Sequence, residues 1–346
     1  MSSRRQLTKI AAIGTLCVAL FALSAAAGVL IAHDSLTAKF VLLGPLGARA
    51  SSNLTGAPRV EQTTWSVVPS QLRDANDWLV FSCPQVHFCI GAGSAFNGSG
   101  YTVVSRDRGA TWKSSAPNGY GMVPRFDDVG CQRVNLCLGL LDVFGPITLA
   151  RSSDQGRDWT NVAAPANFHA LGLHATQLSC SRSFCLVFGA LQSGKIPPNS
   201  YVAAVTRDGG NSWTPSSIPA NVTNIEALSC AGSGRCFVVY NTVSHEYVDF
   251  AYSDDFGQHW TRVHSPYGSP APGHLSCPNS LVCYYLGNSL NETVDGGLSW
   301  TQNIIPQLTT DYNGRINAQS LSCATASTCV VLGHYRFQQV AFVDHL

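Results

Sequence analysis

Twelve of the 13 cysteines fall into six short pairs that repeat along the chain with a nearly constant period. The first members of successive pairs are separated by 48, 49, 50, 47 and 46 residues. Such a period indicates supersecondary units that are each too small to bury an apolar face alone. Six units fill residues 59–346, so the sequence predicts a single repeat domain there. The pairs are Cys83/Cys89, Cys131/Cys137, Cys180/Cys185, Cys230/Cys236, Cys277/Cys283 and Cys323/Cys329.

A second motif, Ser/Thr-x-Asp-x-Gly-x-x-Trp, repeats five times in phase with the cysteines. Its residue types suit a hairpin turn, because the carboxylate and hydroxyl can bond loop amides, Gly accepts a positive φ and Trp packs below the turn. A calcium loop is the alternative, but each copy offers one or two carboxylates where calcium takes six to eight oxygens. The Asp and Trp residues are Asp107/Trp112, Asp154/Trp159, Asp208/Trp213, Asp255/Trp260 and Asp295/Trp300.

This motif resembles the Asp-box, or BNR, repeat of sialidases and related β-propellers, and the resemblance covers residues 59–346. It implies an all-β, six-bladed β-propeller with four strands in each blade. The segments between boxes agree with that expectation. Residues 228–240 indicate a strand, a tight turn and a second strand, while 248–253 and 260–266 indicate a third and a fourth. The 31 Gly and 17 Pro also favour many turns over long helices.

The two ends of this region predict how the ring closes. The sixth cysteine pair is followed by FQQVAFVDHL, which contains no box. Residues 63–70, TTWSVVPS, match the fourth strand of another unit, with Trp65 and Pro69 in the places of Trp260 and Pro266. We therefore expect the N-terminal segment to supply the outer strand of the last blade.

The N-terminus carries an uncharged run of 23 residues, 10–32, after three basic residues. This run is long enough to cross a bilayer of about 30 Å, and the basic residues predict a cytoplasmic tail at 1–9 with the propeller outside. A cleaved signal peptide is the alternative, because the apolar core 10–23 precedes the small residues 25–27, and the propeller would then be secreted. Residues 33–58 are expected to form a linker.

Outside the cytoplasm, the six cysteine pairs are expected to form one hairpin disulfide per blade. Metal sites are the alternative, but the spacing is C-x5-C five times and C-x4-C once, spread over the whole ring. We predict no metal and no cofactor, and expect Cys17 to be unpaired. Beyond residue 9 there are 18 basic and 20 acidic residues, so no net positive charge favours nucleic acid.

The cysteine turns and the boxes should share one uniform face, while loops of variable length and composition form the opposite face, where recognition is expected. The resemblance to sialidases implies an arginine clamp, a Tyr nucleophile with a Glu base, and an Asp acid. Candidates for the clamp are Arg125, Arg315 and Arg336. Glu246 is the candidate base. Tyr247, Tyr312 and Tyr335 are candidate nucleophiles, and Asp127, Asp128 and Asp311 are candidate acids.

The sequence departs from the sialidase pattern in ways that favour binding over catalysis. Val123-Pro124-Arg125-Phe126 does not match the motif that carries the first arginine, and the chain has only four Glu. The leading expectation is therefore a non-catalytic binding or scaffold module for a protein or glycan, tethered to a membrane through 10–32, with a glycoside hydrolase as the alternative. A carboxylate pair about 5 to 9.5 Å apart in the central funnel would favour hydrolysis. Candidate binding residues are His169, His174, Asp311, Tyr312 and Tyr335, and a solvated loop side chain is the plain interpretation of each.

Overall fold

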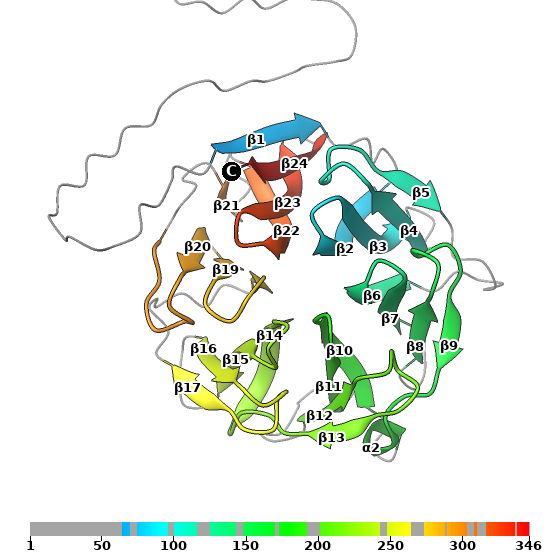
Figure 1. Cartoon of the computed structure of the whole chain (residues 1–346), viewed down its shortest axis with the longest axis vertical. Helices are drawn as coiled ribbons and strands as arrows, with labels where there is room; N and C mark the ends of the chain where they lie inside the picture. The colour runs from blue at the N-terminus through cyan, green and yellow to red at the C-terminus, as the bar shows by residue number, and fades with distance from the viewer. Residues whose placement is uncertain are drawn as a thin grey trace, which may run out of the picture. The chain divides into compact units, whose positions relative to one another are not determined.

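The computed structural model describes residues 64–69, 75–95, 100–115, 125–142, 148–169, 173–191, 201–242, 248–263, 273–287, 289–302, 308–309, 316–335 and 338–345. These residues form a β-propeller, in which small sheets surround a central channel (Figure 1). Within them, the only helix is α2, Ala166–His169. We name each sheet after the strand that lines the channel.

Three sheets follow one another along the first half of the propeller, and each runs outward in sequence order. The β2 sheet has β2 (Ala75–Gln85), β3 (Phe88–Ala95), β4 (Gly100–Ser105) and β5 (Lys113–Ser115). The β6 sheet has β6 (Arg125–Arg133), β7 (Leu136–Asp142), β8 (Thr148–Ser152) and β9 (Thr160–Val162). The β10 sheet has β10 (Leu173–Cys180), β11 (Cys185–Leu191), β12 (Tyr201–Thr206) and β13 (Thr214–Ser216).

Two further sheets continue the ring. The β14 sheet has β14 (Val222–Cys230), β15 (Cys236–Thr242), β16 (Asp249–Ser253) and β17 (Thr261–Val263). The β18 sheet has only β18 (His274–Ser276), β19 (Cys283–Leu286) and β20 (Leu290–Thr293). The expectation of four strands in every unit is wrong here. A single bridge between Glu292 and Thr301 takes the place of the outer strand, because the chain pairs there at one residue only.

The last sheet joins the two ends of the propeller, as the sequence predicts. It contains β1 (Thr64–Pro69), β24 (Gln338–His345), β23 (Thr328–Tyr335), β22 (Ile316–Thr325) and β21 (Leu308–Thr309), in that order. β1 pairs with β24 antiparallel over six residue pairs, from Thr64 opposite His345 to Pro69 opposite Val340. The short β21, which pairs parallel to β22, was not expected.

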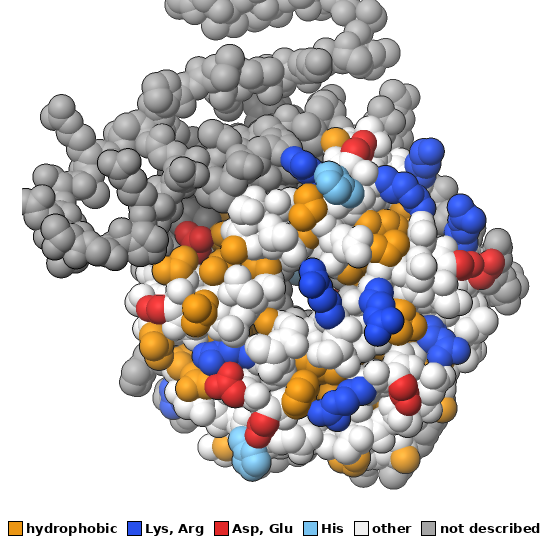
Figure 2. Space-filling model, in the orientation of Figure 1, with side chains coloured by type: hydrophobic (Ala, Val, Ile, Leu, Met, Phe, Trp, Pro, Cys, Tyr) orange, Lys and Arg blue, Asp and Glu red, His pale blue; other side chains and the backbone are white. Residues whose placement is uncertain are grey.

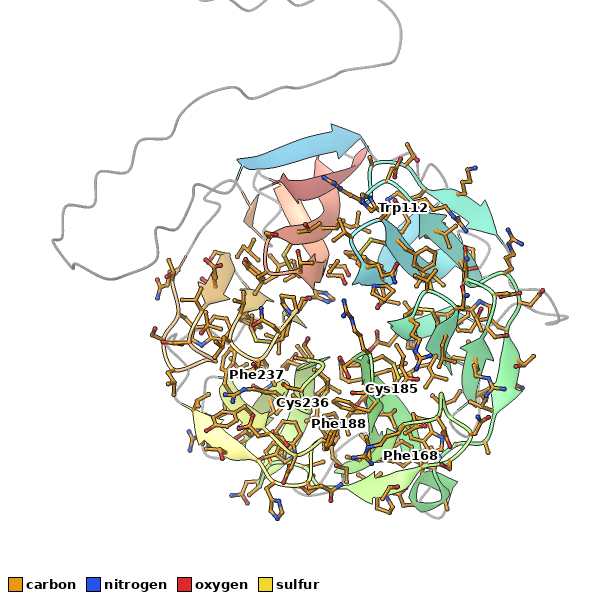
Figure 3. All side chains as sticks on the ribbon, in the orientation of Figure 1. Trp112, Phe168, Cys185, Phe188, Cys236 and Phe237 are labelled. Atoms are coloured by element: carbon orange, nitrogen blue, oxygen red, sulfur yellow. A yellow bond between two sulfur atoms is a disulfide. The ribbon has the colours of Figure 1, made fainter. Side chains whose placement is uncertain are left out.

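The hydrophobic core lies between neighbouring sheets rather than within any one of them. Phe188 of β11 packs in one cluster with Leu228 and Val238 of the β14 sheet, and its ring lies 6.0 Å from that of Trp260 (Figure 3). A similar cluster joins Ile90 of the β2 sheet to Phe126 of the β6 sheet. Each unit therefore buries its apolar faces against the next, which is why the repeat cannot stand alone.

The predicted hairpin disulfides are confirmed. Each closes the hairpin between the first two strands of its sheet, with Cα atoms 3.9 to 4.1 Å apart. The six bonds are Cys83–Cys89, Cys131–Cys137, Cys180–Cys185, Cys230–Cys236, Cys277–Cys283 and Cys323–Cys329.

These hairpins share a face with the turns that carry the Ser/Thr-x-Asp-x-Gly-x-x-Trp motif. Arg235, in one hairpin, donates to the carbonyl of Gly296, in the motif turn of the next sheet. We call this side of the propeller the box face, and the opposite side the loop face.

The five motif turns have the predicted backbone geometry. In the turn of the β6 sheet, the Ser152 hydroxyl donates to Asp154 and accepts the amide of Gly156, both at 2.8 Å. Gly156 has a φ of 80°, and a Cβ there would lie 2.3 Å from Cδ1 of Ile90, so both conformation and space require glycine. Every motif carboxylate accepts the hydroxyl two residues before it, which is the role expected of a turn carboxylate. These carboxylates are Asp107, Asp154, Asp208, Asp255 and Asp295.

The indoles of the motif tryptophans make their hydrogen bonds in two ways. The indoles of Trp112 and Trp159 donate to the glycine carbonyl of their own turn, at 3.0 and 3.2 Å, and so pack below it as expected. Trp213 and Trp260 differ, because each indole donates to a carbonyl of the preceding sheet's outer edge. Trp213 donates to Ala163 at 3.1 Å, just after β9, and Trp260 makes the equivalent bond just after β13.

Trp300 also reaches the preceding sheet, through its ring. Its centroid lies 5.5 Å from that of Phe250 on β16, within the cluster that joins the β14 and β18 sheets. The motif tryptophans therefore also pack against the preceding sheet, a second role that the sequence does not predict. These rings are large enough to cover the boundary with the neighbouring sheet, and burial of that boundary decides where they lie.

The predicted membrane segment 10–32, the tail 1–9, the linker 33–58 and Cys17 lie outside the described residues. Among the residues that are described, no helix has the length and apolar character needed to span a membrane.

Candidate functional site

The six inner strands enclose a channel with a cavity of about 300 Å³ at its centre. Each inner strand contacts the inner strand of both neighbours, so the ring is continuous. The channel wall repeats in register with the cysteines, because every inner strand runs from the loop face toward its first cysteine and the residues up to that cysteine line the cavity. Positions four and three residues before that cysteine therefore form two layers around the channel.

β-Bulges change the direction of the side chains in the layer that lies four residues before the first cysteine. The pairing register shifts at Asp127, Thr176, Glu226 and Gln319, each four residues before the first cysteine of its unit. A bulge leaves one residue unpaired and turns its side chain, and bulges are common beside binding sites. Asp127 and Glu226 both line the cavity. Two acidic side chains from different sheets thus stand at equivalent heights in one channel.

A ring of serine hydroxyls ties the inner strands together. The residue just before the first cysteine is serine in five units, and its Oγ accepts the backbone amide of the first cysteine of the next sheet. Ser179 accepts from Cys230 at 2.9 Å, and Ser322 accepts from Cys83 at 2.9 Å, across the closure. The other three bonds run to Ser82 from Cys131, to Ser229 from Cys277, and to Ser276 from Cys323.

The ring is interrupted at one place, between the β6 and β10 sheets, where Gly130 stands in place of serine. There the carboxylate of Asp128 makes the inter-sheet bond instead. Its Oδ2 accepts the amide of Leu178 at 2.8 Å, while Oδ1 accepts the amide of Val129 at 2.8 Å. Asp128 therefore holds its two sheets together as the serines hold the others.

Enclosure among the inner strands raises the pKa of Asp128 to about 7, although the two amides favour the charged form and oppose the shift. The neighbouring charge of Asp127 raises this pKa further. A carboxyl with such a pKa can exchange a proton near neutral pH, which is the property of a general acid. Its two oxygens already accept backbone amides, however, so the same carboxyl has a structural task.

Glu226 is positioned by amide side chains. Its Oε1 accepts Nδ2 of Asn224 at 2.7 Å and Nδ2 of Asn241 at 2.5 Å. Gln177, on the neighbouring inner strand, donates to the Glu226 backbone carbonyl at 3.4 Å. Asn224 also accepts the Tyr201 hydroxyl at 3.2 Å, which extends the network into the β10 sheet. Such a network holds the carboxylate in one orientation.

His274 completes the polar wall of the channel from the β18 sheet. Its side chain is exposed to the space of the channel, and enclosure by the surrounding strands lowers the pKa of His274 below its ordinary value. The imidazole is therefore neutral at pH 7, with one donor and one acceptor nitrogen. The cavity thus offers a neutral ring and fixed carboxylates rather than a dense field of one charge.

Charge is distributed unevenly along the channel axis. Figure 2 shows Lys and Arg side chains around the central opening on the face that it presents. The box turns contain Arg106, Arg108, Arg157 and Arg207, and the cysteine hairpins contain Arg133, Arg182 and Arg235. Asp127 and Glu226 lie about 13 Å from the hairpin end, at roughly 3.3 Å per residue along each strand. The same turns also contain Asp107, Asp154, Asp158, Asp208, Asp254, Asp255 and Asp295, so the box face carries charges of both signs, whereas Asp127 and Glu226 make the inner channel acidic.

The structure describes only part of the sequence-predicted site. Asp127 and Asp128 lie on the inner strand β6 and line the channel, and not on a variable loop of the loop face where the sequence predicts them. Arg125, His169, His174 and Tyr335 lie on β6, α2, β10 and β23, and only their backbone is described. Glu246, Tyr247, Asp311, Tyr312, Arg315 and Arg336 lie outside the described residues. Sequence reasoning passed over Glu226, Gln177 and His274, although alignment of the units on their cysteines places all three at the channel.

No protein-family model and no curated protein matches the sequence. Solved β-propellers do match the fold. They include an α-L-arabinofuranosidase from Fusarium graminearum, with 13% identity over 82% of this chain and 98% of that chain and a TM-score of 0.53. They also include a fucose-specific lectin from Aleuria aurantia (9% identity, 82% and 92% covered, TM-score 0.52) and a Hadza microbial sialidase (14% identity, 77% and 64% covered, TM-score 0.52). At these identities the likeness shows the fold alone.

Proposed function

We propose that this protein is a non-catalytic binding module, tethered to a membrane through residues 10–32 with its propeller outside the cytoplasm. It recognises a protein or glycan partner on its loop face and in the channel. The observation that carries this proposal is the use of the channel carboxylates. Asp128 substitutes for a missing serine between two sheets, and Glu226 is held by two amide side chains. Carboxylates committed in this way position a ligand better than they transfer protons.

The proposed compartment agrees with the disulfides. Six hairpin disulfides persist in oxidising surroundings and are rare in the cytosol. Protease added to intact cells is expected to digest the propeller while a tag placed at residue 1 survives. Digestion of both, or of neither, would contradict the proposed topology. Release of the propeller into the medium would support the cleaved signal peptide instead.

A glycoside hydrolase is the second candidate, and one observation favours it. Enclosure raises the pKa of Asp128 to about 7, the range in which a carboxyl can donate a proton to a leaving group. Asp127 would then be the second carboxylate, beside it on the same strand.

One assay separates these two functions. Full-length protein in lipid nanodiscs is screened on a glycan array and with fluorogenic glycosides, under oxidising conditions. We expect no turnover, and binding that weakens in Glu226→Gln. Turnover that disappears in Asp127→Asn or Asp128→Asn, in protein that stays folded, would establish a hydrolase and overturn the binding proposal.

A further inference from the structure

A second cavity, of about 240 Å³, lies away from the channel at the outer strands of the β14 sheet. Tyr240, Asp249 and Arg262 line it from β15, β16 and β17, and Trp260 closes one side. The connection that precedes β14 forms the opposite wall with Pro219 and its neighbours. The cavity therefore combines aromatic rings, an apolar wall and a charged pair in a space smaller than the roughly 300 to 1,000 Å³ of ordinary ligand pockets.

Two hydrogen bonds join the charged pair in this cavity. Asp249 is 5% exposed, and its Oδ1 accepts Nη2 of Arg262 at 2.6 Å and Nε at 3.1 Å. Half of the Arg262 side chain remains exposed, so the pair can be reached from the cavity. A buried ion pair is weak evidence for stability, because desolvation offsets most of its Coulomb attraction. Stability alone therefore does not explain the presence of the Asp249–Arg262 pair.

The units of the repeat show that these residues are additions to the fold. Tyr240 pairs with Asp249 across β15 and β16, and the equivalent of Tyr240 is glycine in four other sheets. The equivalents of Asp249 are uncharged in every other sheet, and Arg262 has no charged counterpart on β5, β9 or β13. The glycines are Gly93, Gly189, Gly287 and Gly333. Three departures from a repeat that converge on one cavity indicate function rather than folding.

The aromatic rings are fixed before any ligand arrives. Trp260 donates its indole N–H to the Ser217 carbonyl at 3.0 Å and packs against Phe188, so the ring plane cannot turn. Tyr240 is 3% exposed, and burial raises its pKa to about 12, with the nearby Asp249 charge acting in the same direction. Its hydroxyl therefore stays protonated. Rigid rings lose little entropy on binding, which favours affinity for a small ligand.

We propose that this cavity binds a single sugar residue of a glycan. A sugar ring has an apolar face of C–H groups that matches an aromatic ring, and an edge of adjacent hydroxyls that needs both acceptors and donors. Trp260 supplies the aromatic ring. The Asp249–Arg262 pair supplies the acceptors and donors. This cavity lies outside the channel, so the inference goes beyond the proposed function. It also narrows the ligand from a protein or glycan to a glycan.

The test uses full-length protein in lipid nanodiscs, because a sugar-headed detergent would compete. Saturation-transfer NMR is recorded with the methyl glycosides of glucose, galactose, mannose, fucose, arabinose and N-acetylglucosamine. At least one is expected to bind. Arg262→Lys keeps the charge opposite Asp249 but loses the planar fork, and should weaken binding at least tenfold. Tyr240→Phe, which removes only the hydroxyl, should weaken it less.

Matched variants separate this site from the channel. Arg151→Lys changes an arginine on the third strand of the β6 sheet, and Glu226→Gln changes the channel. Arg151→Lys should bind the methyl glycosides as the unaltered protein does, whereas Glu226→Gln tests whether the channel, instead of this cavity, holds them. Binding by none of the six glycosides would overturn the inference and leave a protein partner for the channel. Binding that survives Arg262→Lys and is lost in Glu226→Gln would also overturn it, while supporting glycan recognition by the channel.

Discussion

The Ser229 hydroxyl accepts a hydrogen bond from the backbone amide of Cys277, at 2.8 Å, across the boundary between two sheets. The same bond recurs at four other boundaries, three of which join residues 47 to 51 apart in sequence, while the fourth closes the ring between Ser322 and Cys83. At the remaining boundary, Gly130 faces Cys180, and a Cβ built there would lie 3.0 Å from Sγ and 3.2 Å from the amide nitrogen of Cys180. Asp128 supplies the missing acceptor two residues earlier. The inner wall of the propeller is therefore a closed series of side chain to backbone bonds.

Ser229→Ala is expected to lower the free energy of unfolding by about 1 to 3 kcal/mol, because it leaves the Cys277 amide buried without this acceptor. Urea denaturation under oxidising conditions measures the change. The control is Ser183→Ala, since Ser183 is exposed and its hydroxyl bonds the Gly232 carbonyl at 3.4 Å. Equal effects in the two variants would argue against a special role for the serine ring.

Because of Asp128, the free energy of unfolding should fall as pH rises through the range 4 to 7. Its folded pKa, about 7, lies above its unfolded value of about 4, so the folded state holds the proton over this window. The stabilisation is complete below pH 4 and is lost by pH 8. The difference in unfolding free energy between the unaltered protein and Asp128→Asn should shrink accordingly, and taking the difference cancels other titrating groups such as His274. Asp127→Asn, one residue away, should show a much smaller trend, because the Asp127 charge is only a minor cause of the raised pKa of Asp128. A constant difference across the window would refute the assignment.

The fold was predictable because its sequence features repeat with a period of about 48 residues. Cysteine pairs and box residues recur at fixed intervals, so one interpretation of the hairpin and of the turn backbone applies to every copy. The β18 sheet is an exception, since only Glu292 and Thr301 pair where an outer strand was expected. Trp213 and Trp260 are another, since their indoles bond the preceding sheet. The residue types do not reveal the missing outer strand of the β18 sheet or the acceptors of these two indoles. Strand length and ring position depend on packing against the neighbouring sheet.

The channel was less predictable for a physical reason. The sequence places its candidate residues in the variable loops, where polar and aromatic residues are concentrated. Glu226 and His274 instead lie on inner strands, among residues that look like ordinary core sequence. The bulge at Glu226 turns its side chain, and a bulge has no signature in residue type here. Asp128 was recognised as polar, but its role depends on the absence of a side chain at Gly130, a relationship that only the assembled ring makes visible.

Asp208→Ala should destabilise the protein at pH 7 by roughly 1 kcal/mol and have little effect near pH 2. The Ser212 hydroxyl and amide both donate to Asp208, which lowers the pKa of Asp208 to about 2. A lowered folded pKa contributes stability above pH 4 that is lost as pH falls toward 2. Thermal unfolding at pH 7, 4 and 2 measures the difference. Asp254→Asn is the control, because Asp254 is an exposed carboxylate whose pair with Arg235 should contribute little. A difference that persists at pH 2 would mean that Asp208 acts through packing instead.

The boundary of the folded unit should fall between residues 59 and 71. β1 makes six residue pairs with β24 and covers the outer edge of the last sheet. A chain that begins at residue 59 keeps β1, and it should unfold cooperatively at the same urea concentration as the full-length propeller. A chain that begins at residue 71 exposes the edge of β24, whose unpaired amides and carbonyls can pair with another molecule. We expect that chain to aggregate in size-exclusion chromatography and to unfold at lower urea. If both chains stay monomeric and equally stable, closure of the propeller does not depend on β1.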